Sequence, residues 1–409
     1  MTDQSSVARR NFIRKSGLMI AGGAISGAMV AGKAVAGRSR RPIRVGVVGC
    51  GRRARALLDS VLSIDESVRV VALADVLPSQ VQATYRTVKG RHAEQLDANC
   101  LRCSGWDAYE SVMQTDADLV YLTAPPVFRP QHFEAAIDSG KHVFLEKPLA
   151  ADVGQTVRMM GLAQRAFANG QSAFVGFQKR FDPCYDETIQ RIQSGAIGRL
   201  IWARTYCNAG PLKSPRVANK ESQREFEVRN WNHFHWTGGE LHLEQHVAGL
   251  DRIRAATSEL PVAASAQGGW GMPPESAGVT DSERVFDHLT VEYEFGTGLR
   301  LMSQCRRGGS QPGKQVGEHL HGSEGRADLA AGRLYDAEDR LIWKSPTRAS
   351  SQTATALQQR FIVESIRSEE VINEVDDAAE STLFALLGQL ASKSRKRETW
   401  NDMLRSAAT

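Results

Sequence analysis

Cysteine is scarce in this chain, and so are long apolar runs. Six cysteines in 409 residues are too few for a disulfide scaffold (Cys50, Cys100, Cys103, Cys184, Cys207 and Cys305). Cys100 and Cys103 form the one close pair, and without a second such pair or neighbouring histidines this spacing does not predict a zinc site. The sequence leaves open whether Cys100 and Cys103 form a disulfide or remain two free thiols. The weakly apolar stretch at residues 18–32 is diluted by glycine and too short to cross a bilayer, so we expect no stable membrane anchor.

The first 36 residues are instead predicted to be a twin-arginine signal peptide. Residues 9–15 read RRNFIRK, the weakly apolar stretch follows, and Ala34-Val35-Ala36 matches a cleavage pattern. Ala8 departs from the pattern, since such signals usually carry Ser or Thr there, and a disordered basic terminus is the alternative. We therefore expect contact with the twin-arginine export machinery and a periplasmic location.

Excess charge is also absent once this segment is set aside. The chain has a formal net charge of +5, but residues 1–36 carry five basic residues and one acid, which leaves +1. Composition therefore gives no reason to expect a nucleic-acid partner or binding to an anionic membrane. The 373 residues that remain exceed what one core usually holds, so we expect two domains.

The stretch from Arg44 to Asp75 predicts a dinucleotide site. It reads as a buried strand, a glycine turn, a helix and a second strand that ends in an acid. Gly49 and Gly51 let the backbone approach a pyrophosphate at the helix start, and Ala54 is a small residue that permits close packing of helix and strand. Asp75 is placed to accept both hydroxyls of the adenosine ribose. An ordinary βα turn is the alternative interpretation.

Asp75 also favours NAD over NADP, because its carboxylate would repel the extra phosphate. Arg52 and Arg53 follow the glycines directly and keep NADP open. Both arginines are candidates for binding the pyrophosphate, although arginines on a first helical turn are often only solvated.

Strands and helices alternate through residue 178, which predicts a doubly wound parallel sheet for residues 37–178. Ligands bind at the carboxyl ends of such strands. The loop around Pro125 and the Glu146-Lys147-Pro148 turn both begin where a strand ends, so both should face the cofactor crevice. We expect helices near 78–89, 107–114, 131–139 and 153–169, and strands near 118–122, 142–145 and 172–177.

The pattern changes at residue 179, and residues 179–409 are predicted to form a second α/β domain. Hairpin-like spacing, as at Phe295-Gly-Thr-Gly298, indicates a mixed or antiparallel sheet. The expected helices lie near 182–194, 240–257, 353–369 and 376–392, and the extended runs near 261–267, 286–295, 298–305 and 315–320, with shorter ones to 343.

Four motifs in order resemble the glucose-fructose oxidoreductase and inositol dehydrogenase family (Gfo/Idh/MocA). They are GVVGCGRRA at 46–54, KHVFLEKPLA at 141–150, GFQKRF at 176–181 and SGAIG at 194–198. The resemblance implies NAD(P)-dependent oxidation of a CH–OH group, a Rossmann domain, and a second domain whose open sheet carries the substrate face and often the oligomer contact. It places Lys147 beside the nicotinamide and the substrate hydroxyl, with Glu146 in the same motif.

Lys147 is the catalytic candidate on physical grounds as well. An ammonium near a carbinol oxygen lowers the cost of forming an alkoxide, and burial can lower the pKa of an amine toward that of a general base. The alternative is a surface lysine in a strand-to-helix turn.

Relatives usually carry an acid, a histidine four residues later and a further acid on one helix, and here that pattern is altered. Glu244 and Asp251 match the two acids, which leaves Ala248 at the histidine position. His246 is the nearest substitute acid-base group. His242 and His246 lie at i, i+4, but Glu244 points elsewhere on the helix, so we predict no bound metal.

Aromatic and basic residues around this helix are candidate substrate contacts. Trp231 and Trp236 suit the C–H faces of a sugar ring, with core packing as the alternative. Arg180 follows a strand end and would bind a hydroxyl or carboxylate, with a structural salt bridge as the alternative. Asp251 belongs to the same predicted site.

An exported nicotinamide enzyme has no free pool of cofactor, so we expect tight retention and regeneration on the enzyme. The leading hypothesis is an exported NAD(P)-dependent oxidoreductase that acts on a carbohydrate or polyol hydroxyl. An NAD-dependent glycoside-cleaving enzyme with a redox-neutral oxidation-elimination cycle is the first alternative. A non-catalytic cofactor-binding protein is the second. A sheet face bare of helices would favour a homo-oligomer.

Overall fold

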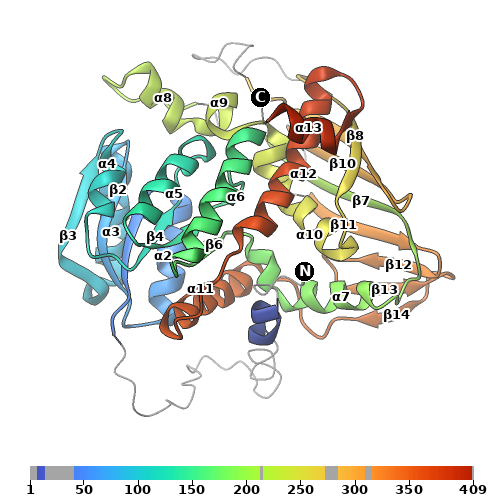
Figure 1. Ribbon diagram of the computed structural model, residues 1–409, viewed down its shortest axis with the longest axis horizontal. Coiled ribbons are helices and arrows are strands. Elements are labelled where there is room, and N and C mark those ends of the chain that lie inside the picture. The colour runs from blue at the N-terminus through green and yellow to red at the C-terminus, as the bar shows by residue number, and fades with distance from the viewer. Residues whose placement is uncertain (1–6, 14–40, 212–214, 272–283, 309–314, 408–409) are drawn as a thin grey trace.

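Two β-sheets organise the protein (Figure 1). The structure is a computed structural model and describes residues 7–13, 41–211, 215–271, 284–308 and 315–407. Most of the predicted signal peptide, including its apolar stretch and its cleavage pattern, lies outside the described residues. Among the described helices, none combines the length and hydropathy that crossing a bilayer requires.

The first sheet is parallel, with the strand order β3-β2-β1-β4-β5-β6. From β1 the chain adds β2 and β3 on one side of the sheet, and it then adds β4, β5 and β6 on the other side. A topological switch point therefore lies between β1 and β4. Ligands bind at such a point. The strands are β1 (Arg44–Val48), β2 (Arg69–Asp75), β3 (Leu96–Ser104), β4 (Leu119–Leu122), β5 (His142–Leu145) and β6 (Ala173–Val175).

Helices cover both faces of this sheet, as a doubly wound fold requires. In α2, Leu57, Leu58, Val61 and Leu62 form one apolar face that is buried against the strands. Asp152 caps α6 by accepting a hydrogen bond from Gln155 N. The helices are α2 (Arg52–Ile64), α3 (Pro78–Arg91), α4 (Ala108–Met113), α5 (Arg129–Asp138) and α6 (Val153–Ala168), with short turns η1 (Ala93–Gln95), η2 (Pro126–Phe128) and η3 (Gln178–Phe181).

The second sheet is mixed, with the order β14-β13-β12-β11-β7-β10-β9-β8-β15. β10 runs parallel to β7 and the other neighbours pair antiparallel. The predicted tight turn at 295–298 is confirmed, since Gly298 N donates to Phe295 O at 3.0 Å. The strands are β7 (Leu200–Ala209), β8 (Pro261–Gly269), β9 (His288–Phe295), β10 (Arg300–Arg307), β11 (Gln315–Gly322), β12 (Gly325–Asp328), β13 (Arg333–Asp336), β14 (Leu341–Lys344) and β15 (Glu398–Thr399).

Helices pack on one face of this second sheet (Figure 1). The other face exposes large apolar side chains such as Trp202 and Met302. The predicted α/β class, with a parallel sheet followed by an open mixed one, is therefore confirmed. The remaining helical elements are α7 (Pro183–Gln193), α8 (Gln223–Arg229), η4 (Trp231–His233), α9 (His235–Gly238), η5 (His242–His246), α10 (Val247–Thr257), α11 (Ser351–Arg367), α12 (Val375–Ser394) and α13 (Trp400–Ser406).

The chain returns to the first sheet near its carboxyl end. α11 packs against α2, and Phe361 and Ile362 share a buried cluster with Leu57 and Phe174. The predicted division at residue 178 stays a prediction, and α11 belongs by its packing to the amino-terminal sheet.

Residues 7–13 are helical and pack against the folded body. The Phe12 ring lies edge-on to Phe361 with 5.4 Å between centroids, and Ile13 is buried. Arg9 Nη1 lies 3.4 Å from Oε1 of Glu374, which is itself buried. The start of the twin-arginine run therefore contacts α11 and the start of α12.

Candidate functional site

The glycine turn after β1 has the geometry of a phosphate-binding loop. Gly49 adopts φ +92°, and a Cβ there would lie 2.3 Å from the backbone nitrogen of Ala124. At Gly51, no described atom lies within 4 Å of an added Cβ, so open space faces the start of α2. Ala54 is buried where a small residue was expected. Within the described residues no side chain caps the start of α2 and its first turn holds no acid, which leaves backbone N–H groups for an anion.

Asp75 ends β2 beside this turn, as predicted. Its Oδ2 accepts a hydrogen bond from Cys50 N at 2.7 Å, and its Oδ1 accepts one from Leu77 N at 2.8 Å. Burial raises the pKa of Asp75 to about 6, against the lowering effect of these two N–H groups. Each carboxylate oxygen keeps a further lone pair, so the group can accept two ribose hydroxyls.

A small cavity of about 40 Å³ lies next to Asp75. Flat side chains line it, which suits an adenine ring. Burial lowers the pKa of His132 to about 3, so this wall is neutral near neutral pH. The lining includes Gly49, Asp75, Trp106, Tyr109, Pro125, Phe128, His132 and Val228. The uncapped helix and the acid fit the pyrophosphate and the ribose of a dinucleotide, and the flat side chains of the cavity wall suit its adenine.

The affinity of the nucleotide-free protein for NAD should fall below pH 6, roughly tenfold per pH unit, because protonated Asp75 loses the charge that holds the ribose. The raised pKa of Asp75 also affects folding. The folding stability of the nucleotide-free protein falls as the pH rises from about 4 to 6, because ionising the buried Asp75 carboxyl is costly. His132 stays neutral across this range, and the other charged neighbours of Asp75 are Arg55 and Arg229, which lower its pKa. Calorimetric titration with NAD from pH 7.5 to 5 measures the effect, and Asp75→Asn should flatten it. A flat profile for the unmodified protein would contradict the assignment.

The Glu146-Lys147-Pro148 turn follows β5, as predicted, and is held by two arginines. Arg53 Nε donates to Glu146 Oε1 at 2.6 Å, so its predicted contact with a pyrophosphate stays a prediction. Arg52 is exposed at the helix start, where binding to the pyrophosphate also stays a prediction. Buried Arg129 donates to Pro148 O and, at 2.8 Å, to Ala124 O, which ties the turn to the loop after β4.

Lys147 reaches across to the second domain. Its Nζ donates to Glu244 O at 2.6 Å and lies 3.4 Å from Glu244 Oε1. The side chains of Lys147 and Glu244 are each 22% exposed, so both remain open to a substrate. The structure therefore brings together two of the three predicted catalytic residues.

Arg307 on β10 holds Glu244 from the other side. Its Nη2 donates to Glu244 Oε2 at 3.0 Å, and its Nε donates to Gln245 Oε1 at 2.6 Å. Its Nη1 also donates to Asn232 O, which fixes the loop before the helix. Sequence reasoning missed Arg307, because no local motif marks it and it lies 63 residues from Glu244.

His246 points away from Lys147. It is 1% exposed, and its Nε2 lies 2.9 Å from Ser303 Oγ on β10. His242 is buried beside Tyr293, and burial lowers its pKa to about 3. Among residues 241–253 the half-exposed ones are instead Glu244, Gln245 and Ala248, so Ala248 shares the exposed face of Glu244. An acid-base role for His246 stays a prediction that this packing does not favour.

No three His, Cys, Asp or Glu side chains group as metal ligands among the described residues. His242 contacts Tyr293 and Cys305 of the second sheet through its two ring nitrogens, and His246 contacts Ser303 through Nε2. The six cysteines all lie in the described ranges and are free, Cys100 and Cys103 included.

The two tryptophans before this helix make contacts of their own. Trp236 Nε1 donates to Glu227 Oε2 at 3.0 Å, and its ring lies edge-on to Phe128. Trp231 packs against Gly238, where an added Cβ would lie 3.1 Å from the ring. Contact of either ring with a substrate stays a prediction.

Arg180 and Asp251 form a buried ion pair. Asp251 accepts from Arg180 Nε at 3.1 Å and from Ser381 Oγ at 2.7 Å, and the side chains are 7% and 2% exposed. Asp251 and Asp377 raise the pKa of Arg180 against the effect of burial. This is the structural salt bridge that the sequence left as the alternative, and a substrate role for either residue stays a prediction.

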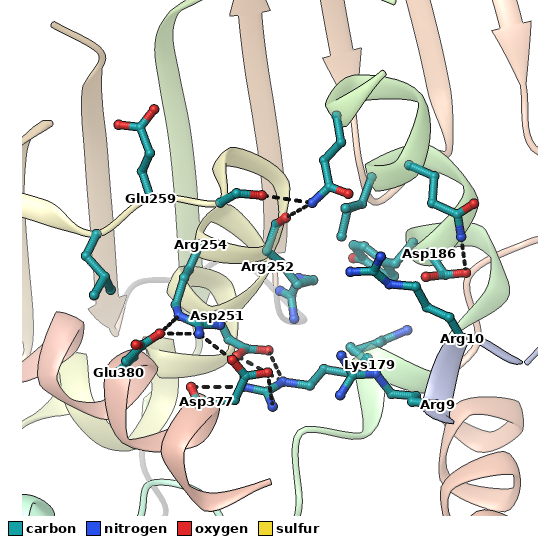
Figure 2. Close-up of a pocket in the computed structure, with 18 residues that line it drawn as sticks. Arg9, Arg10, Lys179, Asp186, Asp251, Arg252, Arg254, Glu259, Asp377 and Glu380 are labelled. Carbon is teal, nitrogen blue, oxygen red and sulfur yellow. Dashed lines mark hydrogen bonds and ion pairs between the residues drawn. The ribbon is translucent and has the colours of Figure 1, made fainter. Parts of the chain in front are cut away.

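The pair lines a separate cavity of about 510 Å³ between α7, α10 and the start of α12. Figure 2 shows Asp251, Asp377 and Arg254 together on one side of it, with Arg9 and Arg10 on the other. Lys147 and Asp75 do not line this cavity. The structure therefore does not bring Arg180 and Asp251 together with the predicted cofactor site.

Comparison with known proteins agrees with the glycine turn and the crevice. Residues 43–175 match the oxidoreductase family with an NAD-binding Rossmann fold, Gfo/Idh/MocA. The chain is 30% identical over 179 residues, 44% of its own length and 41% of the relative, to a 1-carboxy-3-chloro-3,4-dihydroxycyclohexa-1,5-diene dehydrogenase of Comamonas testosteroni. It is 26% identical over 196 residues, 46% of this chain and 54% of the relative, to an inositol 2-dehydrogenase of Salmonella typhimurium.

The fold agrees over a longer stretch. A scyllo-inositol dehydrogenase from Lactobacillus casei, solved with bound NAD(H) and scyllo-inositol, superposes with a TM-score of 0.65 over 88% of this chain and 99% of that chain, at 20% identity. The sequence matches to curated relatives span about half of their length. The match to the family model thus covers residues 43–175, and the fold over most of the chain is shared with a solved dehydrogenase.

Proposed function

We propose that this protein is an exported NAD-dependent oxidoreductase that acts on a hydroxyl group of a sugar or polyol and keeps its cofactor bound. The observation that carries the proposal is the contact of Lys147 with Glu244, at the carboxyl edge of the dinucleotide-binding sheet. Dehydrogenases of inositol and of a cyclic diol among the relatives support the substrate class.

The chain's own residues perform the proton transfer. The dinucleotide, when bound, accepts the hydride from the substrate carbon. Lys147 relays the hydroxyl proton: its Nζ passes a proton to Glu244 Oε1, 3.4 Å away, and takes the hydroxyl proton in its place. Asp75 and the start of α2 orient the cofactor, and the loop held by Arg307 covers this edge of the sheet.

Glu244 takes over the role that a histidine at position 248 would have. Ala248 moves no proton, but the Glu244 carboxylate already contacts the lysine from the same helix face. A lysine and a carboxylate side by side also suit the redox-neutral elimination cycle, which needs a base at carbon and an acid at the leaving group.

Cofactor content tests the proposal. The protein is purified from its host without added nucleotide and denatured, and the released nucleotide is identified. Near-stoichiometric NAD supports retention, and NADP would reverse the predicted preference. A protein that is empty and also fails to bind added NAD would overturn the proposal. Incubation with inositols, aldoses and aryl glycosides then separates net oxidation from release of a free sugar without net reduction of NAD. Cell fractionation tests the periplasmic location.

Replacing Arg307 by glutamine should lower kcat by about 10- to 100-fold. We also expect the acid limb of the rate–pH profile to move to higher pH, because the Glu244 carboxylate loses a neighbouring positive charge. Arg307→Lys should restore part of the rate by keeping the charge. Arg306→Gln is the matched control, since Arg306 Nη1 donates to Gly308 O. An unchanged pH profile in Arg307→Gln would contradict the positioning role.

A further inference from the structure

A segment of the second domain lies over the adenosine end of the cofactor site. This segment, residues 215–236, follows β7 and contains α8, η4 and the start of α9; we call it the strap. Val228 on α8 is 7% exposed and lines the 40 Å³ cavity together with Gly49 and Asp75. The wall of a pocket formed by the first domain is thus completed by a residue of the second.

The strap is anchored to the loop after β4. The Trp236 ring lies edge-on to Phe128 with 6.3 Å between centroids, and α9 packs against η2. The ring centroid of Phe128 in turn lies 6.1 Å from that of Trp106, which also lines the cavity. Trp236 Nε1 also donates to Glu227, the neighbour of Val228. The residue that contacts Phe128 is therefore hydrogen-bonded next to the residue that lines the cavity.

The strap is also built to keep its shape. Ser222 and Glu225 form a reciprocal capping box at the start of α8. The Asn230 side chain accepts from Arg216 N at 2.8 Å and donates to Arg216 O at 2.9 Å, which closes the loop that carries α8. Arg229 pairs with Glu221 at 2.7 Å and places a positive charge near Asp75.

The space under the strap is small. A cavity of about 40 Å³ is far smaller than the ~150 Å³ of a protein cavity that holds benzene, so an adenine ring enters only if the wall that α8 completes moves outward. The same movement must precede release of a bound dinucleotide.

We propose that the strap forms the outer wall of the adenosine subsite and that α8 must open before the dinucleotide leaves. The proposal rests on the proposed function, because it takes NAD as the ligand. It gives a structural basis for a cofactor that stays bound where no free pool exists.

The test is the release rate of NADH. Protein loaded with NADH is mixed with excess NAD, and the loss of bound-NADH fluorescence is followed. Val228→Ala removes two methyl groups from the wall and should speed release about tenfold. Replacing residues 222–230 by a glycine-serine linker should speed it further. Val217→Ala is the matched control, since Val217 lies in the strap and is 73% exposed.

The outcomes separate the two proposals. If the unmodified protein binds no NADH, the proposed function fails. If all variants bind NADH stoichiometrically and Val228→Ala releases it at the unmodified rate, the strap proposal alone is overturned. A thermal unfolding scan of each variant separates a local change in the strap from a general loss of stability. If the change is local, the unfolding temperature of the nucleotide-free Val228→Ala protein stays close to that of Val217→Ala.

Discussion

Replacing Lys147 by methionine is expected to lower kcat by roughly a thousandfold, within the usual range for a general acid-base group. Methionine fills much the same volume but holds no proton, so the substrate hydroxyl loses its acceptor. The contact with Glu244 is partly exposed, and its loss should cost at most about 1 kcal/mol of folding stability. The NAD content should therefore stay unchanged while turnover falls, which is measured by comparing kcat with nucleotide released on denaturation.

Lys141→Met is the control for this experiment. Lys141 precedes the opposite end of β5, and its Nζ donates to Thr115 O. Lys141→Met makes the same side-chain change as Lys147→Met but outside the predicted cofactor site, so kcat should change little. If Lys147→Met instead keeps full turnover, Lys147 does not carry the proton transfer and the proposed catalytic role is wrong.

The second large effect separates the two glycines of the phosphate loop. Gly49→Ala should destabilise the protein by more than about 3 kcal/mol, because its Cβ would lie 2.3 Å from a backbone nitrogen at a φ of +92°. Gly51→Ala should leave the nucleotide-free fold intact, since φ is −75° and no described atom lies within 4 Å of its Cβ. The same Cβ would stand where the pyrophosphate approaches the helix, so NAD affinity should fall at least about a hundredfold.

Thermal unfolding and NADH titration of both variants check this pair. The expected result is a lower unfolding temperature for Gly49→Ala, and a nearly unchanged unfolding temperature with weak binding for Gly51→Ala. Normal binding by Gly51→Ala would show that the dinucleotide does not approach the start of α2.

The parallel sheet was predictable because its strands are short apolar runs between helical patterns. β4 reads Leu-Val-Tyr-Leu and is buried throughout, and such runs are typical of strands covered on both faces. β3 and β7 were missed. β3 mixes polar and apolar residues at the sheet edge. β7 begins with the apolar run Leu-Ile-Trp-Ala but continues through Arg204, Thr205 and Asn208, so its pattern is that of neither a short buried strand nor a strict alternation.

The predicted helix at 240–257 is interrupted by the π-helical turn η5, and periodicity alone gave no sign of this change. The motif residues Gly49, Asp75 and Lys147 lie where the sequence placed them, because each follows a strand end. The partners of these residues were not predictable. Arg307 and Val228 reach the site through pairings of segments far apart in the chain, and only the folded arrangement brings them there.

The return of α11 to the first sheet has a consequence for biosynthesis. The cluster that holds Leu57 and Phe174 also needs Phe361 and Ile362, which the ribosome makes almost last. A fragment ending at residue 178 would leave this apolar face bare, and we expect it to aggregate. The nucleotide-binding half therefore matures only after α11 has been synthesised, so loading with cofactor is a late event in the folding of this protein.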